Sequence, residues 1–244
     1  DFSFFSLERA ANQDEPLQYD AFFFSGLTSL PERSYHDKPE VVAGLENIVE
    51  DFFNNIHQKD AKLRAQKLVA FEKANAQTVP LPKEFRERFS QRNPIERSAL
   101  TTALSQIDLK AVFSQIGEKT KLRDLTPENF KFINEQLATA DLDLLKDLYR
   151  FHALQGLLDD AYPKFFNNKF VFYQKHLGGP NVRPDRQERC TKMVMSSFGK
   201  ELDAELLPRM FPDFPTAKFI SFVERIRAAI VAGVEQNTWL SPQG

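Results

Sequence analysis

The sequence lacks several features that would point directly to a class of function. It has a single cysteine, Cys190, so an internal disulfide is impossible and cysteine usage leaves the redox compartment open. Its 32 Lys and Arg residues nearly balance its 34 Asp and Glu residues, which argues against nucleic acid or an anionic membrane surface as a partner. The apolar runs are far shorter than the roughly 20 residues that cross a bilayer, so no membrane span is expected.

Motifs of catalysis are missing as well. The chain has no G-x-S-x-G, no phosphate-binding loop and no dinucleotide fingerprint. Its four histidines lie outside any His-Glu-x-x-His pair, the arrangement that places two zinc ligands and a glutamate base on one helix face: His36, His57, His152 and His176. His36 and Glu40 have the spacing of a ligand pair, but Pro39 interrupts the turn between them. We therefore expect no catalytic residue and no metal or cofactor site in this chain.

Cys190 follows a run of arginines and admits three interpretations: a nucleophile, half of a missing disulfide, or a small core residue. Arg186 and Arg189 could favour the thiolate that a nucleophile needs. However, Cys190 lies on the apolar stripe of a predicted helix, and free cysteines are among the most buried residues. We predict a largely buried, unpaired thiol that reacts slowly while the protein is folded.

Glycine is scarce, with 9 residues, and the 3.6-residue helical period recurs without sustained strand-like alternation. These features predict an all-α fold. Thr126 and Pro127 are typical of an N-cap and first helical position, and residues 141–161 are apolar on most sides, which predicts a central buried helix. The expected helices cover residues 41–56, 60–76, 94–106, a short stretch after Asp108, a stretch from 127, then 141–161, 164–177, 185–206 and 219–234.

No internal repeat and no Gly/Ser linker divides the chain, so we expect one helical domain over residues 1–244. Within it, residues 1–38 are expected to be an irregular lead-in. Residues 39–177 would form the central helices and residues 184–240 a final helical pair.

Several segments carry a family resemblance. R-P-D-R-Q-E-R-C at 183–190, F-G-K-E-L at 198–202, V-E-R-I-R-A-A-I at 223–230 and W-L-S at 239–241 resemble the end of the N-terminal domain of neprilysin-like M13 zinc metallopeptidases. S-G-L-T-S-L-P-E-R-S-Y at 25–35 is similar to the G-L-x-L-P-x-R-x-Y-Y signature of that family. The matching residues are Gly26, Leu27, Leu30, Pro31, Arg33, Tyr35, Arg186, Arg189, Cys190 and Trp239.

The chain also departs from the family pattern at specific positions. His36 replaces the second tyrosine, Asn75 stands where a leucine is usual, and Leu109 stands where a tryptophan is usual. In many members, a cysteine at the position of Cys190 pairs with one nearer the N-terminus, in a region that we expect this chain to lack. The sequence therefore resembles a divergent member.

The resemblance implies a multi-helix cap lobe of a two-lobed metallopeptidase. The zinc motif would lie in a second, catalytic lobe that we expect to be absent from this chain, so this chain alone would be inactive although its parent would be an enzyme. The cap lobe would enclose the cavity and restrict substrates to short peptides. Its partners would be the catalytic lobe and those peptides, in a secreted or periplasmic setting.

Two other classes of function stay open. The chain could be a stand-alone helical module that binds peptides or proteins and has lost its catalytic lobe. It could also be an enzyme with an unrecognised metal site.

Overall fold

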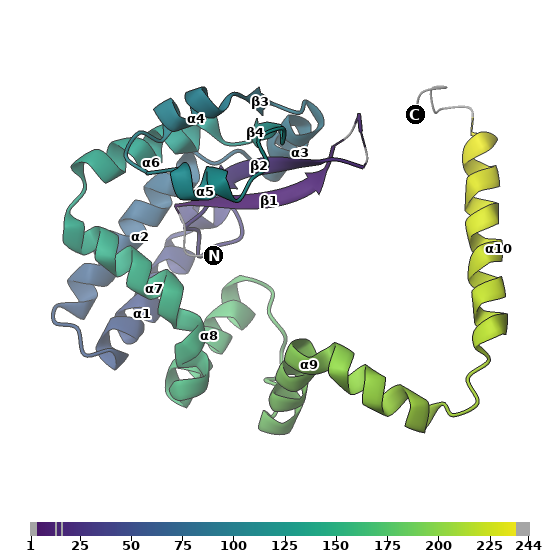
Figure 1. Cartoon of the computed structure of the whole chain (residues 1–244). Coiled ribbons are helices and arrows are strands. Elements are labelled where there is room, and N and C mark those ends of the chain that lie inside the picture. The colour runs from purple at the N-terminus through teal and green to yellow at the C-terminus, as the bar shows by residue number, and fades with distance from the viewer. Residues whose placement is uncertain (1–3, 13, 16, 238–244) are drawn as a thin grey trace. The chain divides into compact units, whose positions relative to one another are not determined.

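The computed structural model describes residues 4–12, 14–15 and 17–237, and it divides into two units, residues 1–181 and 182–244 (Figure 1). The first unit contains β1 (Phe5–Ala11), β2 (Tyr19–Ser25), the 3₁₀ helix η1 (Arg33–Asp37), α1 (Pro39–Asn55), α2 (Ala61–Gln77), α3 (Pro82–Ser90), β3 (Pro94–Ile95), α4 (Arg97–Ala103), α5 (Lys110–Ser114), β4 (Leu122–Asp124), α6 (Pro127–Thr139), α7 (Leu142–Ala161) and α8 (Pro163–His176). The second unit contains α9 (Arg186–Met210) and α10 (Thr216–Glu235). The predicted mainly helical class is confirmed.

The lead-in that was predicted to be irregular instead forms two strands of a small sheet. The strand order is β1-β2-β4-β3, with β1 antiparallel to β2, β2 parallel to β4 and β4 antiparallel to β3. The prediction failed because β2 is covered on both faces, so it reads as a continuous apolar run, Ala21 to Phe24, without alternation. The other partners, β3 and β4, are only 2 and 3 residues long.

Helices α1, α2, α7 and α8 pack around one apolar core of the first unit. Phe52 of α1 is at its centre: its ring lies 5.2 Å from that of Phe53 and 5.1 Å from that of Phe151 on α7. All three side chains are almost fully buried. A Cβ at Gly44 of α1 would approach Phe172 of α8 to 2.7 Å, so the glycine allows these helices to pack closely.

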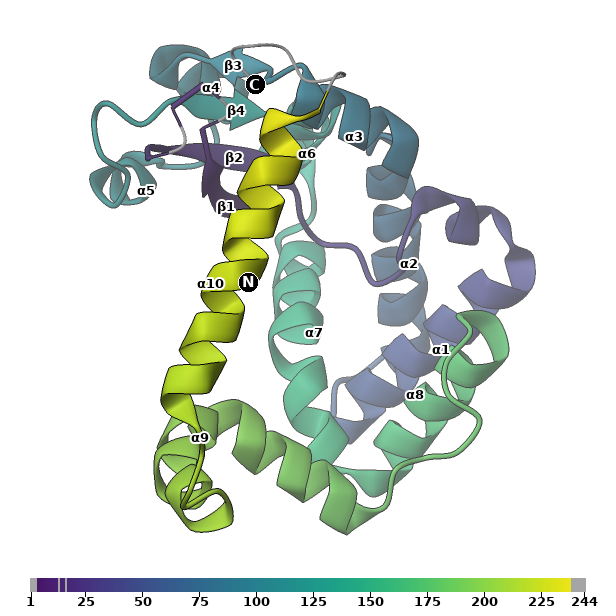
Figure 2. The ribbon, with the colours of Figure 1, turned by 90° about the vertical axis from the view of Figure 1, so that its right-hand side faces the viewer.

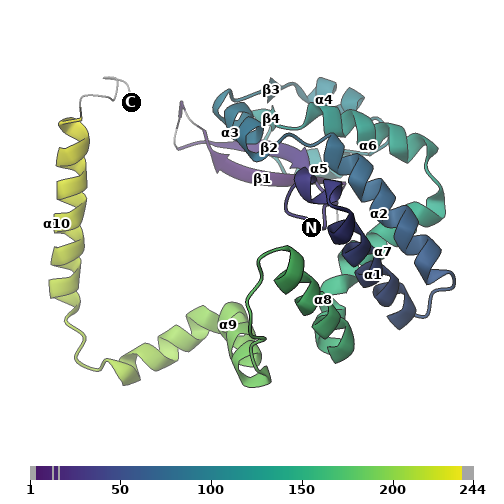
Figure 3. The same ribbon diagram turned by 180° about the vertical axis from the view of Figure 1, so that it is seen from behind.

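A second apolar core lies under the sheet. Phe5 and Phe23 from the strands contact residues of α4 and α6, such as Leu100 and Phe130. Helix α6 joins the two cores because Phe130 belongs to the second and Ile133, one turn later, to the first. Figures 2 and 3 show the strands near one end of the unit and α1, α7 and α8 towards the other.

Most of the expected helices are present, but α3 was not predicted, and the helix expected over residues 94–106 is shorter because Pro94 and Ile95 form β3 and α4 covers only Arg97–Ala103. Pro127 begins α6 as predicted, and α1 begins at Pro39, two residues before the expected range of 41–56. The Thr126 hydroxyl makes no cap bond, although the Thr126 N–H donates to Asp124 Oδ1 at 2.9 Å. Helix α7 was predicted to be central and buried, yet Leu142 and Leu157 are 62% and 67% exposed. Its apolar residues extend around the helix further than the core that it contacts.

The second unit consists of two amphipathic helices. Helix α9 bends at Phe198, whose φ of −127° and ψ of 22° are not helical, and α10 runs without interruption. No residue described in this unit is buried. In the part of the chain that the structure describes, no helix combines the length and apolarity that crossing a membrane requires.

Candidate functional site

The candidate functional site is the segment of residues 26–37, which carries six of the predicted motif residues, with the buried polar side chains of α2 that hold it. Leu27 and Leu30 are buried in the first core, Gly26 and Arg33 are half-buried, and Pro31 is exposed. Tyr35 packs against the same core, and its ring also receives the Lys38 ammonium at 4.5 Å. The structure thus brings this half of the motif together on one segment.

Glu72 of α2 binds the segment through hydrogen bonds. Its carboxylate is fully buried and accepts hydrogen bonds from the Ser29 hydroxyl at 2.7 Å and the Ser29 N–H at 3.2 Å. His152 Nε2 of α7 lies 2.9 Å from the same carboxylate. A buried charge is tolerated only when donors surround it, and these three contacts tie the segment, α2 and α7 together.

Asn75, one turn after Glu72, holds the start of the segment. Its side-chain N–H groups donate to the carbonyls of Gly26 at 3.1 Å and Leu27 at 3.3 Å. Leu27 has φ of +55°, a conformation that costs free energy for a residue with a side chain. Asn129 of α6 donates to the Asn75 side-chain oxygen at 2.7 Å and to the Thr78 hydroxyl at 2.8 Å, so the strained turn is fixed by a connected network.

His36 is the unusual member of this site. It is 1% exposed, and neither ring nitrogen has a hydrogen-bond partner. Burial lowers the pKa of His36, against the opposing effect of the Glu72 charge. Two departures from the family pattern, His36 and Asn75, therefore lie in the interior of the same site.

The polar side chains Glu72 and Asn75 hold the segment of residues 26–37 in position. Glu72, Asn75 and His36 are almost fully buried, so none of them is presented to a ligand at the surface. Glu72 and the role of Asn75 were not predicted from the sequence, because α2 carries many charged and polar side chains and these two do not stand out among them. The available signal was spacing: both lie on the helix face of the buried Leu68, where apolar residues would be expected.

A second polar site lies at the N-terminus of α6. Arg88 of α3 donates two hydrogen bonds to the Glu128 carboxylate, at 2.7 and 3.0 Å, and one to the Leu125 carbonyl. Asp124 lines a cavity of about 410 Å³ beside Arg88. Burial raises the pKa of Asp124 to about 6, partly opposed by the hydrogen bond from the Thr126 N–H.

The C-terminal half of the motif behaves differently. Arg186 and Arg189 lie in the first turn of α9, where Arg189 Nη1 donates to the Pro184 carbonyl at 3.1 Å. Cys190 is unpaired, as predicted, but it is exposed, so the prediction of burial was wrong for this structure. Its helical phase was read correctly, but nothing in the second unit covers that face. Trp239 lies outside the described residues.

No group of three or more His, Cys, Asp or Glu side chains among the described residues is placed to hold a metal ion. The His36 and Glu40 spacing does not create a ligand pair, because His36 is buried in η1 while Glu40 is exposed at the start of α1.

Comparison with known proteins places this fold. Two solved structures of the Mycobacterium tuberculosis zinc metalloprotease Zmp1 resemble it: an open state at 18% identity and TM-score 0.78, and an inhibitor complex at 17% and 0.77. Each covers 98% of this chain but only 39% and 38% of its own, so the chain spans about two fifths of their length. No curated protein sequence matches it significantly. The N-terminal profile of peptidase family M13 matches residues 1–244, and the chain therefore belongs to that family.

Proposed function

We propose that this chain forms the non-catalytic lobe of a neprilysin-like zinc metallopeptidase. In the parent protein it would enclose a cavity together with a catalytic lobe and restrict substrates to short peptides. The observation that carries the proposal is the match of 98% of this chain to about two fifths of a protein named as a zinc metalloprotease. The remaining three fifths of that protein leave room for a separate catalytic part.

The described residues of this chain do not fit a zinc ion, because they offer no group of three suitable ligands. We therefore assign zinc to the proposed catalytic lobe and derive no chemical step from it here. The motif residues on 26–37 and on α9 are proposed to be structural. The parent is proposed to be secreted or periplasmic, which rests on the family resemblance alone.

A lobe that selects by size must keep its shape when a larger molecule presses against it. The first unit has the features that such a wall needs: two apolar cores joined by α6, and buried polar contacts that fix residues 26–37. Interiors packed in this way deform little, because each shift leaves voids or unpaired polar groups. Selection would thus come from packing rather than from one contact residue.

The proposal is tested with the full-length parent and a graded series of substrates, from short peptides to a folded protein. We expect chelator-sensitive cleavage of the short peptides only, and no cleavage by the 244-residue chain alone. Chelator-sensitive cleavage by the isolated chain would contradict the assignment of zinc to another lobe. Equal cleavage of short peptides and folded proteins by the parent would contradict the role in size selection.

A further inference from the structure

Strand β1 forms an open edge of the sheet. It pairs with β2 along all seven of its residues, from Phe5 opposite Ser25 to Ala11 opposite Tyr19, and no strand formed by the described residues lies on its other side (Figure 1). It contains no proline, no lysine and no bulge, the devices that proteins commonly use to protect an edge. An open edge of this kind is a template for adding another strand.

The hydrogen-bond pattern shows which residues face outward. The Asn12 N–H donates to the Gln18 carbonyl, and the Ala21 N–H donates to the Lys121 carbonyl beside β4. Backbone N–H and C=O groups point to alternate edges along a strand. Those of the even-numbered residues of β1 therefore point towards β2, and those of Leu7, Arg9 and Ala11 point away from it. Among the described residues, no backbone hydrogen bond reaches the outward N–H or C=O of these three.

Buried polar contacts fix β1 to β2 and β2 to β4. Arg123 of β4 donates to the Asp20 carboxylate of β2 through Nε at 2.7 Å and lies within 2.6 Å of it through Nη2, and both side chains are buried. Asn12 donates to the same carboxylate at 2.8 Å, which fixes the end of β1 to β2. A ligand that pairs with β1 would therefore meet an ordered strand and lose little free energy in ordering it.

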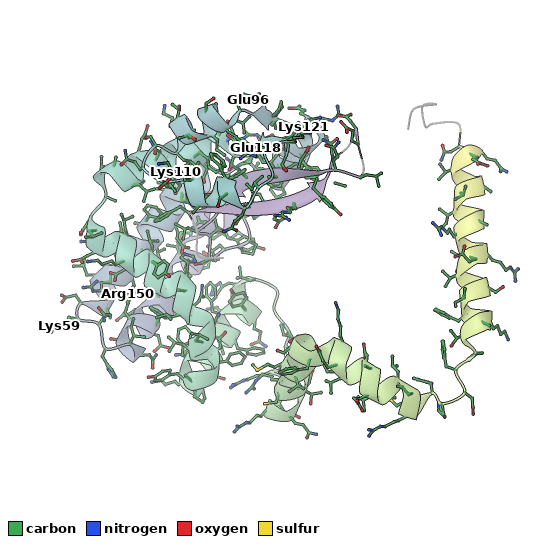
Figure 4. The ribbon with its side chains drawn as sticks, in the orientation of Figure 1. Lys59, Glu96, Lys110, Glu118, Lys121 and Arg150 are labelled. Carbon is green, nitrogen blue, oxygen red and sulfur yellow. The ribbon has the colours of Figure 1, made fainter. Side chains whose placement is uncertain are left out.

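A cationic cavity lies on the sheet face beside this edge. It has a volume of about 310 Å³ and is lined by Arg9 of β1, Tyr19 of β2, and Lys119 and Thr120 of the segment before β4, with no acidic residue in its lining. Arg9 donates to the Gln115 carbonyl at 3.1 Å, which holds its guanidinium over the cavity. Figure 4 shows Lys110, Glu118 and Lys121 on the chain that runs from α5 to β4.

We propose that the free edge of β1 binds an extended peptide in antiparallel pairing, with an acidic side chain of the peptide placed against Arg9 and Lys119. In such a pair, the residue opposite Arg9 exchanges both backbone hydrogen bonds with it, and its side chain lies on the same face of the sheet as Arg9. The backbone pairing supplies affinity for any extended peptide, and the cavity selects the acidic residue. The inference goes beyond steric exclusion and rests on the proposed function only in taking a peptide as the ligand.

Charge favours a peptide over a second copy of this chain. Full antiparallel overlap of two β1 strands would place Glu8 directly opposite Glu8 of the copy, and like charges opposite one another destabilise a strand pair. Nor would that copy supply an acidic side chain opposite Arg9, because in this register Arg9 pairs with Leu7. The acidic peptide satisfies both requirements that the second copy fails.

The test measures fluorescence anisotropy of labelled peptides with the whole 244-residue chain. The probe is a seven-residue, strand-forming peptide with one central glutamate, and its control has glutamine in place of that glutamate. Both peptides can form the same backbone hydrogen bonds, but only the probe places a carboxylate against Arg9 and Lys119, so we expect the control to bind about tenfold more weakly. N-methylation of the backbone of the central residue should abolish binding without any change to the protein.

Protein variants locate the site. Leu7→Pro removes one outward N–H, which an edge strand tolerates, and should weaken binding about tenfold relative to Leu7→Ala. Lys119→Gln should weaken binding of the acidic probe about fivefold but leave the matched control Lys110→Gln unchanged, because Lys110 does not line the cavity.

Three results would overturn the proposal: no binding of the probe, equal binding of the glutamate and glutamine peptides, or binding unaffected by N-methylation. Self-association in sedimentation that Leu7→Pro removes would assign the edge to a second copy and overturn it as well. None of these measurements uses peptidase activity. Failure here would thus leave the proposed cap function standing, and an inactive parent would leave the binding result standing.

Discussion

The two units of this chain use apolar residues in opposite ways. In the first unit, large side chains such as Phe23, Phe52 and Phe130 are almost completely buried. In the second unit no described residue is buried, and Phe219, Ile226 and Ile230 are 53%, 44% and 61% exposed, although they recur at helical spacing. Figure 4 shows the side chains of α10 projecting outward from the helix, and the ring of Phe219 contacts that of Phe214 just before the helix, at 5.6 Å.

The two units show that an apolar stripe on a helix and the burial of that stripe are separate properties. An apolar stripe shows that a helix has a face to cover, but the element that covers it can come from anywhere. In α1 the stripe meets α2, α7 and α8, so spacing and burial agree. In α10 the stripe is as regular, yet the second unit supplies no core. The stability of α1 should therefore depend on the apolar side chains that it buries within its own unit, whereas that of α10 should not.

The largest expected effect follows from this difference. We predict that Phe52→Ala lowers the free energy of unfolding by about 3–5 kcal/mol, because it leaves a cavity among three aromatic neighbours. Phe222→Ala on α10 should change it by less than about 1 kcal/mol, since this side chain is 56% exposed. Urea denaturation of the whole chain, followed by circular dichroism, measures both.

The two variants remove the same atoms, so they form a matched pair. Similar losses of stability in both would show that α10 buries its face in solution, and the contrast between the units would fail. A small loss for Phe52→Ala would contradict the position of this residue at the centre of the first core.

Much of the fold was predictable from the sequence for a local reason. Proline at position 39 or 127, with the apolar stripe that follows, sets a helix through interactions within a few residues. The sheet was not predictable in this way, because β2 is defined by its partners: Phe22 stacks on Phe89 of α3 at 4.8 Å, and Phe23 faces the opposite core. A strand covered on both faces loses the alternation that would reveal it.

The candidate site was predictable only as a location. The motif pointed to residues 26–37 but not to Glu72. The Glu72 carboxylate accepts a hydrogen bond from the Ser29 hydroxyl, and the two residues are 43 positions apart in the sequence. A buried carboxylate resembles a surface one in sequence until its donors are known. The same limit applies to Cys190, whose exposure depends on what covers α9 and not on its own neighbours.

A second prediction uses pH to separate the units. Because burial raises the pKa of Asp124 to about 6 from 3.8, the unfolded chain releases this proton first as the pH rises. The free energy of unfolding therefore falls by about 3 kcal/mol between about pH 4 and 6, and it stays at the lower value at neutral pH. Asp124→Asn keeps an oxygen to accept the Thr126 N–H but carries no charge. We expect it to stabilise the protein by up to about 3 kcal/mol at neutral pH and by almost nothing at pH 4.

Asp185 provides the control in the second unit. It also accepts a backbone N–H, from Glu188 at 2.8 Å, but it is exposed at the start of α9. Asp185→Asn should change stability by only a few tenths of a kcal/mol across the same pH range, because asparagine is an equally good N-cap. Denaturation curves of wild type and both variants at pH 4, 5, 6 and 7 decide the matter. Parallel pH profiles for wild type and Asp124→Asn would contradict the buried, protonatable carboxyl.

The smallest expected effect concerns the single thiol. Since Cys190 is exposed on α9, its labelling rate in the native chain should lie within about tenfold of the rate in denaturant, because access does not limit an exposed thiol. The chain has one cysteine, so each labelled molecule carries one reagent, and mass spectrometry gives the rate directly. Native labelling slower by several orders of magnitude would mean that this face of α9 is covered in solution. That result would restore the burial that helical phase predicts, and it would remove the difference between the two units at the residue where it is easiest to measure.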